Sequence, residues 1–244
     1  MADPISVADA LQANLDYLDE VRRVDVDHVD GVRRDPNRVG RTIASLARNA
    51  ATHASATTIA ADASVVDGSV DRETVSDYLS VLERLMIVEE QPAWSPHLRS
   101  RSVLRTAPKR HFVDPSPAVA ALRAGPDRLL RDLNLLGPLF EPMGVRDLRV
   151  YAQESSGRVS QYPVNTGLEV DAVVETSDDR WAAFEVKLGA GLVDEGADSL
   201  SRFADRIDTA KCGPPAVLGV IVGTGYGYVR PDGIAVVPIG YLGP

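Results

Sequence analysis

The chain has 244 residues, of which 44% are hydrophobic and 25% are charged. These proportions are typical of globular proteins, and at roughly 150 residues per domain the length predicts two modest domains. The formal net charge of -9 disfavours general electrostatic attraction to nucleic acid or to an anionic membrane. Any contact with nucleic acid is therefore expected to be local.

Simple counts exclude several classes of protein. The longest relevant apolar stretch, Ala216 to Val222, is far shorter than the roughly 20 residues that a membrane-spanning helix needs. No signal segment opens the sequence, and the single cysteine, Cys212, excludes an internal disulfide. Four scattered histidines give no zinc-ligand spacing. We therefore expect a soluble, cytoplasmic protein that does not contact the membrane.

Residues 1–40 are rich in acids and contain one amphipathic pattern, carried by Leu11, Leu15 and Leu18. Acidic runs of this kind are usually solvated faces. We interpret the segment as a helical lead-in that precedes the cores and contributes little to them.

Residues 41–114 have the pattern of three short helices followed by a strand. The helices are expected over Thr42–Ala51, Thr57–Ala61 and Asp71–Met86. The third is the best defined, because its apolar residues recur every three or four positions and Asp71 can cap its first turn. This order predicts a winged helix-turn-helix domain.

The segment from Gln91 to Val113 contains five basic residues and no acid. These residues are Arg99, Arg101, Arg105, Lys109 and Arg110. In a DNA-binding winged helix they would neutralise phosphates while the third helix enters a major groove. The residues of that helix expected to face outward are Thr74, Ser76, Asp77 and Ser80. In the alternative, the module is a packing element whose arginines pair with acids of this acidic chain.

Prolines at residues 115, 117 and 126 mark a linker over residues 115–126, and a second domain is expected over residues 127–244. Its order is helix, three strands, helix and strand, which gives an α/β or α+β class. The expected helices are Arg128–Leu136, Leu139–Ala152 and Ala197–Ala210, and the expected strands are Arg158–Val164, Leu168–Glu175, Trp181–Leu188 and Ala216–Val222, with a closing pair around Tyr226–Val229 and Ile234–Pro238.

Three charged residues of this second domain are candidates for chemistry. Asp171 lies in an apolar strand, where a charge is costly unless it is compensated. In the next strand, period-two alternation places Glu185 and Lys187 on one face and Val186 on the other. A Mg²⁺ ion prefers carboxylate oxygens and water, and Lys187 would orient or help to deprotonate a metal-bound water. The same three residues are also compatible with a simple buried salt bridge.

The run from Gly167 to Asp171, followed by Glu185-Val186-Lys187, resembles the D...ExK core of the PD-(D/E)xK nuclease superfamily. The runs Leu136–Glu141 and Pro231–Gly240 extend the likeness. Together they resemble the C-terminal region of prokaryotic AAA-type ATPases, in which a winged helix precedes a nuclease-like domain. The resemblance implies a restriction-endonuclease-like αβββαβ domain with a mixed sheet.

The resemblance also implies roles for individual residues. Asp171 and Glu185 match the metal-binding acids, Lys187 matches the catalytic lysine, and Glu141 matches the acid on the first helix that completes the metal shell. The implied cofactor is Mg²⁺ or Mn²⁺, and the implied partners are DNA and an AAA-type ATPase. No phosphate-binding loop of the form G-x-x-x-x-G-K-[ST] occurs in the sequence, so we expect no ATPase activity from it.

A further sequence feature works against a live nuclease site. Pro142 directly follows Glu141 inside the expected helix, and an interior proline costs about 3 kcal/mol unless it lies in the first turn, which argues against Glu141 as a metal ligand. Three hypotheses therefore stand: a metal-dependent nuclease that acts on DNA, a catalytically inactive module that binds DNA or a protein for an ATPase, or a degenerate remnant that retains no activity.

Overall fold

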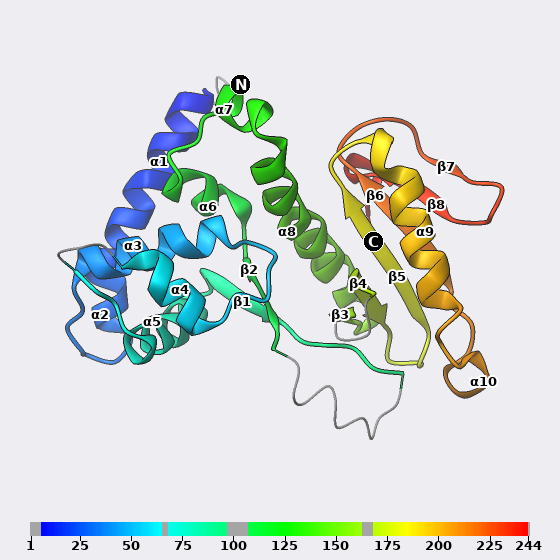
Figure 1. The fold of residues 1–244 in the computed structure, drawn as a ribbon, viewed down its shortest axis with the longest axis horizontal. Coiled ribbons are helices and arrows are strands. Elements are labelled where there is room, and N and C mark those ends of the chain that lie inside the picture. The colour runs from blue at the N-terminus through cyan, green and yellow to red at the C-terminus, as the bar shows by residue number, and fades with distance from the viewer. Residues whose placement is uncertain (1–5, 65–67, 97–106, 163–167, 244) are drawn as a thin grey trace. The chain divides into compact units, whose positions relative to one another are not determined.

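A computed structural model describes residues 6–64, 68–96, 107–162 and 168–243. It is a mixed α/β structure of helices, a two-stranded sheet and a six-stranded sheet, as the sequence predicted at this coarse level (Figure 1).

The chain folds into two compact units. The first unit comprises Met1–Glu90 and Arg110–Pro142, and the second comprises Gln91–Lys109 and Met143–Pro244. No helix in the described residues is both long enough and apolar enough to cross a membrane.

The first unit is mainly helical. Its elements are α1 (Val7–Glu20), the π-helical turn η1 (Val21–Asp25), α2 (Val26–His28), α3 (Pro36–Arg48), α4 (Ala56–Ala63), α5 (Arg72–Arg84), α6 (Pro115–Ala121), α7 (Pro126–Arg131) and the first half of α8 (Leu133–Ala152). Five of these helices begin at a serine or aspartate whose side chain accepts a hydrogen bond from an amide of the first turn. These caps are Ser6, Asp35, Ser55, Asp71 and Asp114.

The interpretation of residues 1–40 as a lead-in outside the cores is wrong. Leu18, Val21 and Val26 are buried in the hydrophobic core of the first unit. Helix α3 begins at Pro36, six residues before the expected start, because Asp35 caps it and Pro36 has the backbone angle of a first helical position. The acids lie on the outer faces of helices whose apolar residues complete the core.

Strand β1 (Val88–Gln91) follows α5, and it pairs with β2 (Lys109–Phe112) in the two-stranded sheet. The turn between α5 and β1 contains Met86, whose φ is +55°. The order of α3, α4, α5 and two strands is thus the order expected from the sequence.

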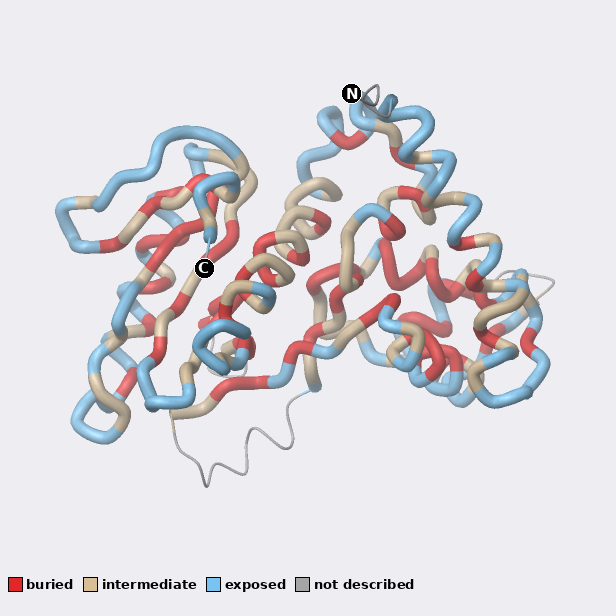
Figure 2. The backbone as a smooth tube through the Cα atoms, turned by 180° about the vertical axis from the view of Figure 1, so that it is seen from behind, coloured by how far each residue is buried: buried red, intermediate tan, exposed pale blue. Residues whose placement is uncertain are grey.

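The second unit is built on the six-stranded sheet. Its strands are β3 (Arg158–Tyr162), β4 (Val170–Glu175), β5 (Trp181–Lys187), β6 (Val217–Val222), β7 (Tyr228–Val229) and β8 (Ala235–Pro238). The order across the sheet is β3-β4-β5-β6-β8-β7. The first three strands are antiparallel neighbours, whereas β6 is parallel to β5 and β8 is parallel to β6. The expected mixed sheet is therefore confirmed, and its central strands are largely buried (Figure 2).

Helix α9 (Val193–Ala204) runs along β5 and β6 and covers one face of this sheet (Figure 1). Its buried residues Leu200 and Phe203 join a core that also contains Trp94 and Trp181. The ring of Phe203 lies 5.8 Å from that of Trp181 and 5.9 Å from that of Trp94, both edge to face. The short helix α10 (Thr209–Cys212) and the 3-10 turns Gln153–Ser155, Ala190–Leu192 and Ile239–Tyr241 complete the unit.

Helices of the later part of the chain also differ from the sequence prediction. The sequence predicted separate helices over Arg128–Leu136 and Leu139–Ala152, whereas α8 is one helix from Leu133 to Ala152 that contains both Pro138 and Pro142. The break lies earlier, at Asp132, whose carboxylate accepts a hydrogen bond from the amide of Leu135. Each proline removes one helical donor, but its fixed φ is compatible with a helix, so packing can hold the helix together.

Helix α9 begins at Val193 and ends at Ala204, whereas the sequence predicted Ala197–Ala210. Gly196 lies inside the helix although glycine is a poor helix former. A Cβ atom at Gly196 would lie 3.2 Å from Val220 and 3.4 Å from the Cβ of Glu185. Glycine is therefore favoured here by the close approach of α9 to β5 and β6.

Candidate functional site

The candidate site lies where β4 and β5 begin to separate. These strands pair Ala172 with Phe184, and continuing that register by one residue places Asp171 opposite Glu185. Oδ2 of Asp171 accepts a hydrogen bond of 2.8 Å from the backbone amide of Val186. This bond caps the end of the hairpin and fixes the Asp171 carboxylate beside β5.

The alternation along β5 is as predicted. The packing around Gly196 places Glu185 on the side of α9, whereas Gly144 of α8 packs against the side chain of Val186. Glu185 and Lys187 therefore share the face that α9 covers, and Val186 points to the opposite face. The ammonium of Lys187 lies 2.7 Å from Oε2 of Glu185.

Helix α9 supplies a further polar group to the site. The hydroxyl oxygen of Ser199 lies 3.2 Å from Oε1 of Glu185 and 3.1 Å from the backbone oxygen of Glu169. Its single proton can be donated to either acceptor. Both carboxylate oxygens of Glu185 are thus in contact with a donor, although only 4% of its side chain is exposed.

Burial, together with the nearby charge of Asp171, raises the pKa of Glu185 to about 8. Burial by itself lowers the pKa of Lys187, but the attraction of Asp171 and Glu185 outweighs it, so that pKa is raised. At neutral pH Lys187 therefore carries its proton, and Glu185 retains one as well. Two buried carboxyl groups on neighbouring strands cannot both ionise at low cost, so a proton or a cation is favoured here.

Lys109 reaches the same region from β2. Its side chain is only 3% exposed, and its Nζ lies 2.5 Å from Oε1 of Glu169 and 3.7 Å from Oδ1 of Asp171. On the paired strand β1, the side-chain amide of Gln91 donates a 2.8 Å hydrogen bond to the backbone oxygen of Asp171. Lys109, expected to contact phosphates, is therefore buried among carboxylates rather than presented on the surface.

The other predicted site residues lie elsewhere or outside the described residues. Arg110 donates to the backbone oxygen of Ala54 at 3.0 Å and to Glu90 at 2.8 Å. Glu141 lies on α8, in the part that belongs to the first unit. The residues that lie outside the described part of the chain are Arg99, Arg101 and Arg105.

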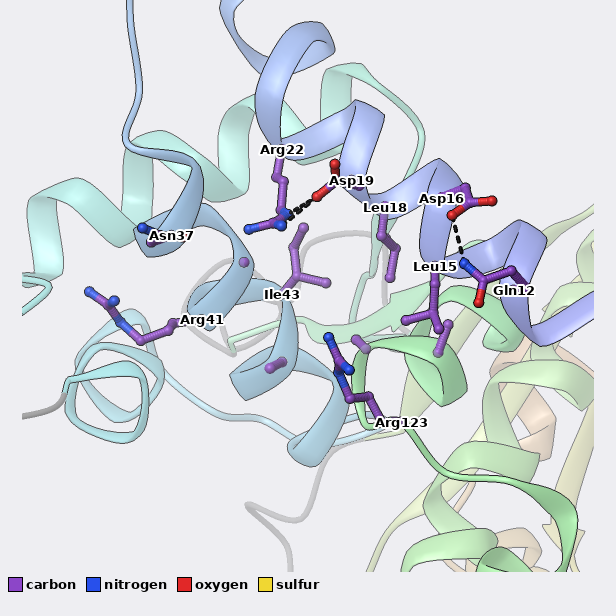
Figure 3. A pocket seen from close by; sticks show the side chains of 14 residues that line it. Gln12, Leu15, Asp16, Leu18, Asp19, Arg22, Asn37, Arg41, Ile43 and Arg123 are labelled. Carbon is purple, nitrogen blue, oxygen red and sulfur yellow. Dashed lines mark hydrogen bonds and ion pairs between the residues drawn. The ribbon is translucent and has the colours of Figure 1, made fainter. Parts of the chain in front are cut away.

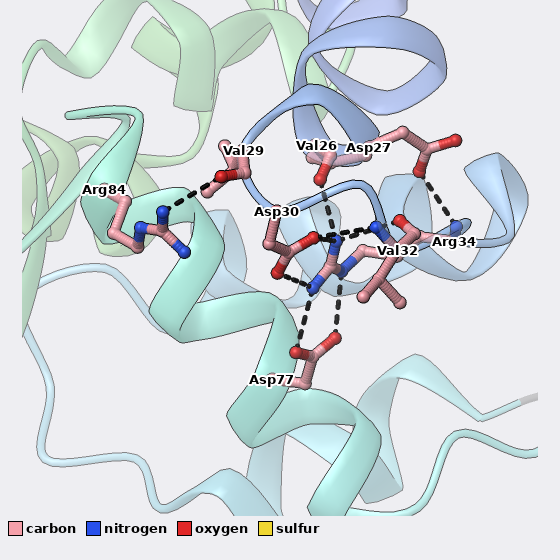
Figure 4. A network of polar contacts seen from close by, with 8 residues as sticks. All are labelled: Val26, Asp27, Val29, Asp30, Val32, Arg34, Asp77 and Arg84. Atoms are coloured by element: carbon pink, nitrogen blue, oxygen red, sulfur yellow. Dashed lines mark hydrogen bonds and ion pairs between the residues drawn. The ribbon is translucent and has the colours of Figure 1, made fainter.

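On α5, the expected groove-facing helix, Ser76 and Ser80 are exposed. Asp77 instead binds the guanidinium of Arg34, with N–O distances of 2.9 and 3.0 Å (Figure 4). The negative charge of Asp77 is therefore used to hold the loop before α3 against α5.

The first unit also contains a cavity of about 670 Å³ (Figure 3). Arg22, Arg41 and Arg123 contribute to its lining, but Arg22 is paired with Asp19. Arg41 donates to the backbone oxygens of residues 63 and 68, both at 3.0 Å. Asp16 and Asp19 line the same cavity, so its charge is mixed, and the stronger candidate site is the one in the second unit.

The candidate site offers two carboxylates, Asp171 and Glu185, to a divalent cation. No group of three histidine, cysteine, aspartate or glutamate side chains is placed to hold a metal ion within the described parts of the chain. Asp171 and Glu185 form a two-carboxylate pair, which fits Mg²⁺, an ion that keeps several waters and uses one or two carboxylates. The mutual repulsion of the two carboxylates is the physical reason for a cation to bind there.

Residues 6–128 match the domain of unknown function DUF8612. The chain belongs to the DUF8612 family. Residues 136–242 of this DUF8612 chain match a second domain of unknown function, DUF4143, which is commonly associated with AAA-type ATPases. That match agrees with the resemblance to ATPase-associated regions seen in the sequence.

No curated protein matches the DUF8612 chain at a significant level. Among solved structures, the crystal structure of protein VC1899 from Vibrio cholerae is similar with a TM-score of 0.30 and 13% identity. The match covers 98% of the DUF8612 chain and 58% of VC1899, so the chain spans less than two thirds of that protein's length. Similarity at this level does not define a shared fold.

Sequence reasoning missed Glu169 and Ser199 as contributors to the site, and it assigned Lys109 a different role. Glu169 had a usable signal, because it precedes Asp171 by two residues and the two are therefore expected on one face of a strand. Ser199 and Lys109 had none, because each comes from an element distant in the sequence.

Proposed function

We propose that the second unit is a PD-(D/E)xK-type phosphodiesterase that cleaves DNA with Mg²⁺ or Mn²⁺. The observation that carries the proposal is the convergence of Asp171, Glu185 and Lys187 at the open end of the β4–β5 hairpin. The order α8-β3-β4-β5-α9-β6, with β6 parallel to β5, supports it because this is the order implied by the sequence resemblance.

Asp171 and Glu185 are the residues that would hold the cation. When bound, it would polarise the scissile phosphate and activate a water molecule. Glu185 has to release its proton for the carboxylate to bind a cation, so cation affinity should increase toward pH 8. Lys187 stays protonated, so we assign it the stabilisation of negative charge on the phosphate rather than proton abstraction.

The helical unit is proposed as a winged helix that assists DNA binding, on the basis of its α3-α4-α5-β1-β2 order. The Arg34–Asp77 pair works against deep insertion of α5 into a groove, because the carboxylate would approach phosphates. DNA contact would then depend on Arg99, Arg101 and Arg105 of the basic segment rather than on α5.

The test is cleavage of labelled linear, branched and single-stranded DNA with Mn²⁺ or Mg²⁺. Asp171→Ala and Lys187→Ala are each expected to reduce cleavage at least about 100-fold. The matched controls are Asp178→Ala and Lys211→Ala, which remove exposed residues of the same charges and should leave cleavage unchanged. Equal cleavage by wild type and both site variants would assign the activity to a contaminant and contradict the proposal.

A second candidate function is a catalytically inactive module that binds DNA or a protein partner for an AAA-type ATPase. One observation favours it: Lys109 and Lys187 already place two positive charges beside the carboxylates. A live metal site gains RT ln(1 + [L]/Kd) of folding free energy as Mn²⁺ is added, and this gain raises the thermal midpoint. No cleavage together with no Mn²⁺-induced stabilisation would select this second function.

A further inference from the structure

The position of Lys109 suggests a role beyond the residues of the D...ExK core. Its ammonium is buried. Its Nζ lies 2.5 Å from a carboxylate oxygen of Glu169 and 3.7 Å from one of Asp171. The strand that carries it pairs with β1, whose Gln91 is bonded to the backbone of Asp171. Lys109 is therefore held next to Asp171 by backbone pairing as well as by charge.

The two oxygens of Asp171 face different donors. Oδ2 accepts a hydrogen bond from the backbone amide of Val186. Oδ1 is the Asp171 oxygen that faces the Lys109 ammonium, at 3.7 Å. A divalent cation that binds Asp171 must approach these same oxygens, and it would then lie close to a buried positive charge. Two cations at such a distance in a poorly solvated region repel each other strongly.

We propose that Lys109 is a resident counter-ion of Asp171 that competes with the divalent cation for this end of the site. The inference rests on the proposed function, because it presumes that Asp171 binds the cation. Cation affinity is low while Lys109 lies beside Asp171, and it increases when Lys109 is neutralised or displaced. Lys109 is thus a regulatory residue of the site and not a phosphate contact.

The test is calorimetric titration of the full chain with Mn²⁺ at pH 7.5, with folding checked by circular dichroism. Lys109→Met removes the charge, and Lys109→Gln removes it while keeping a donor for Glu169. Both are expected to bind Mn²⁺ at least about tenfold more tightly than wild type. Lys109→Arg keeps the charge, and Lys211→Met makes the same change in net charge at an exposed lysine, so both should bind as wild type does.

A double variant keeps the test valid if the single Lys109 variants do not fold. Lys109→Met combined with Glu169→Gln removes the cation together with its closest carboxylate, which leaves the local charge balanced. Compared with Glu169→Gln alone, it should again bind Mn²⁺ about tenfold more tightly.

Two negative results are distinguishable. If Asp171→Asn abolishes Mn²⁺ binding while all Lys109 variants bind as wild type does, the inference is overturned and the metal site of the proposed function stands. If neither wild type nor any Lys109 variant binds Mn²⁺, both the inference and the proposed metal site fail.

Discussion

Each unit of the chain contains a buried cluster of ion pairs, and the two clusters differ in how their charges are balanced. In the first unit, the side chain of Arg34 is 2% exposed, and its guanidinium donates to Asp30, Asp77 and the backbone oxygens of Val26 and Val32 (Figure 4). Every donor group of Arg34 has an acceptor, and both acids keep contact with water.

In the second unit the buried groups include two carboxylates on adjacent strands. The side chain of Asp171 is 10% exposed and that of Glu185 is 4% exposed, so neither is well solvated. Two lysines compensate them, but Glu185 still has a raised pKa because it is buried beside Asp171. A cluster with all donors satisfied holds structure together, whereas a buried pair of like charges indicates a site that binds a proton or a cation.

The largest expected loss of stability comes from a substitution that breaks the ion-pair cluster of the first unit. Arg34→Met leaves two carboxylates and two backbone oxygens without their donor, and it should lower the free energy of unfolding by about 3 kcal/mol. The matched control is Arg48→Met, which removes an exposed pair with Asp62 and should cost less than about 1 kcal/mol. Urea unfolding followed by circular dichroism measures both. Equal losses would contradict a structural role specific to Arg34.

A second prediction concerns the pH dependence of the other cluster. The folded-state pKa of Glu185, about 8, lies above its usual value of 4.5, so the protonated form is favoured by folding. This contribution is fully present below about pH 4.5 and is lost as the pH rises toward 8. Lys187 does not titrate in this window, because its pKa is raised above the usual 10.5.

Relative to Glu185→Gln, wild type should therefore lose on the order of 2 kcal/mol of stability between pH 5 and pH 8. Thermal unfolding at several pH values measures the difference, and Glu154→Gln provides an exposed control that should not change the profile. If the stability of wild type and of Glu185→Gln changed in parallel with pH, burial beside Asp171 would not raise the pKa of Glu185.

The smallest expected effect tests whether packing positions Glu185. In Gly196→Ala the added Cβ meets Val220 and the Cβ of Glu185, so α9 must shift away from β5. We expect a loss of about 1 kcal/mol, or a decrease of about 2–4 °C in Tm. At Gly191 nothing lies within 4 Å of an added Cβ, so Gly191→Ala should change neither the free energy of unfolding nor Tm. An unchanged Tm for Gly196→Ala would show that α9 can move away from β5 without loss of stability.

Several features of this chain were determined by the sequence alone. Helix α5 and strands β4, β5 and β6 lie close to the predicted positions, because local periodicity and turn residues specify them. Glu185 and Lys187 lie on one face of β5 because alternation in a strand depends only on backbone geometry.

Other features were decided only by the tertiary structure. The sequence predicted that the last long helix begins at Ala197, but α9 begins at Val193 and includes Gly196, where it approaches Val220 and Glu185 closely. It also predicted two helices on either side of Pro138, but α8 continues through that proline. Gln91 contacts Asp171 across 80 residues of sequence, and Lys109 reaches the same carboxylate from the paired strand. No local pattern encodes such contacts, because they follow from how distant elements pack, and burial then sets the charge state of Glu185.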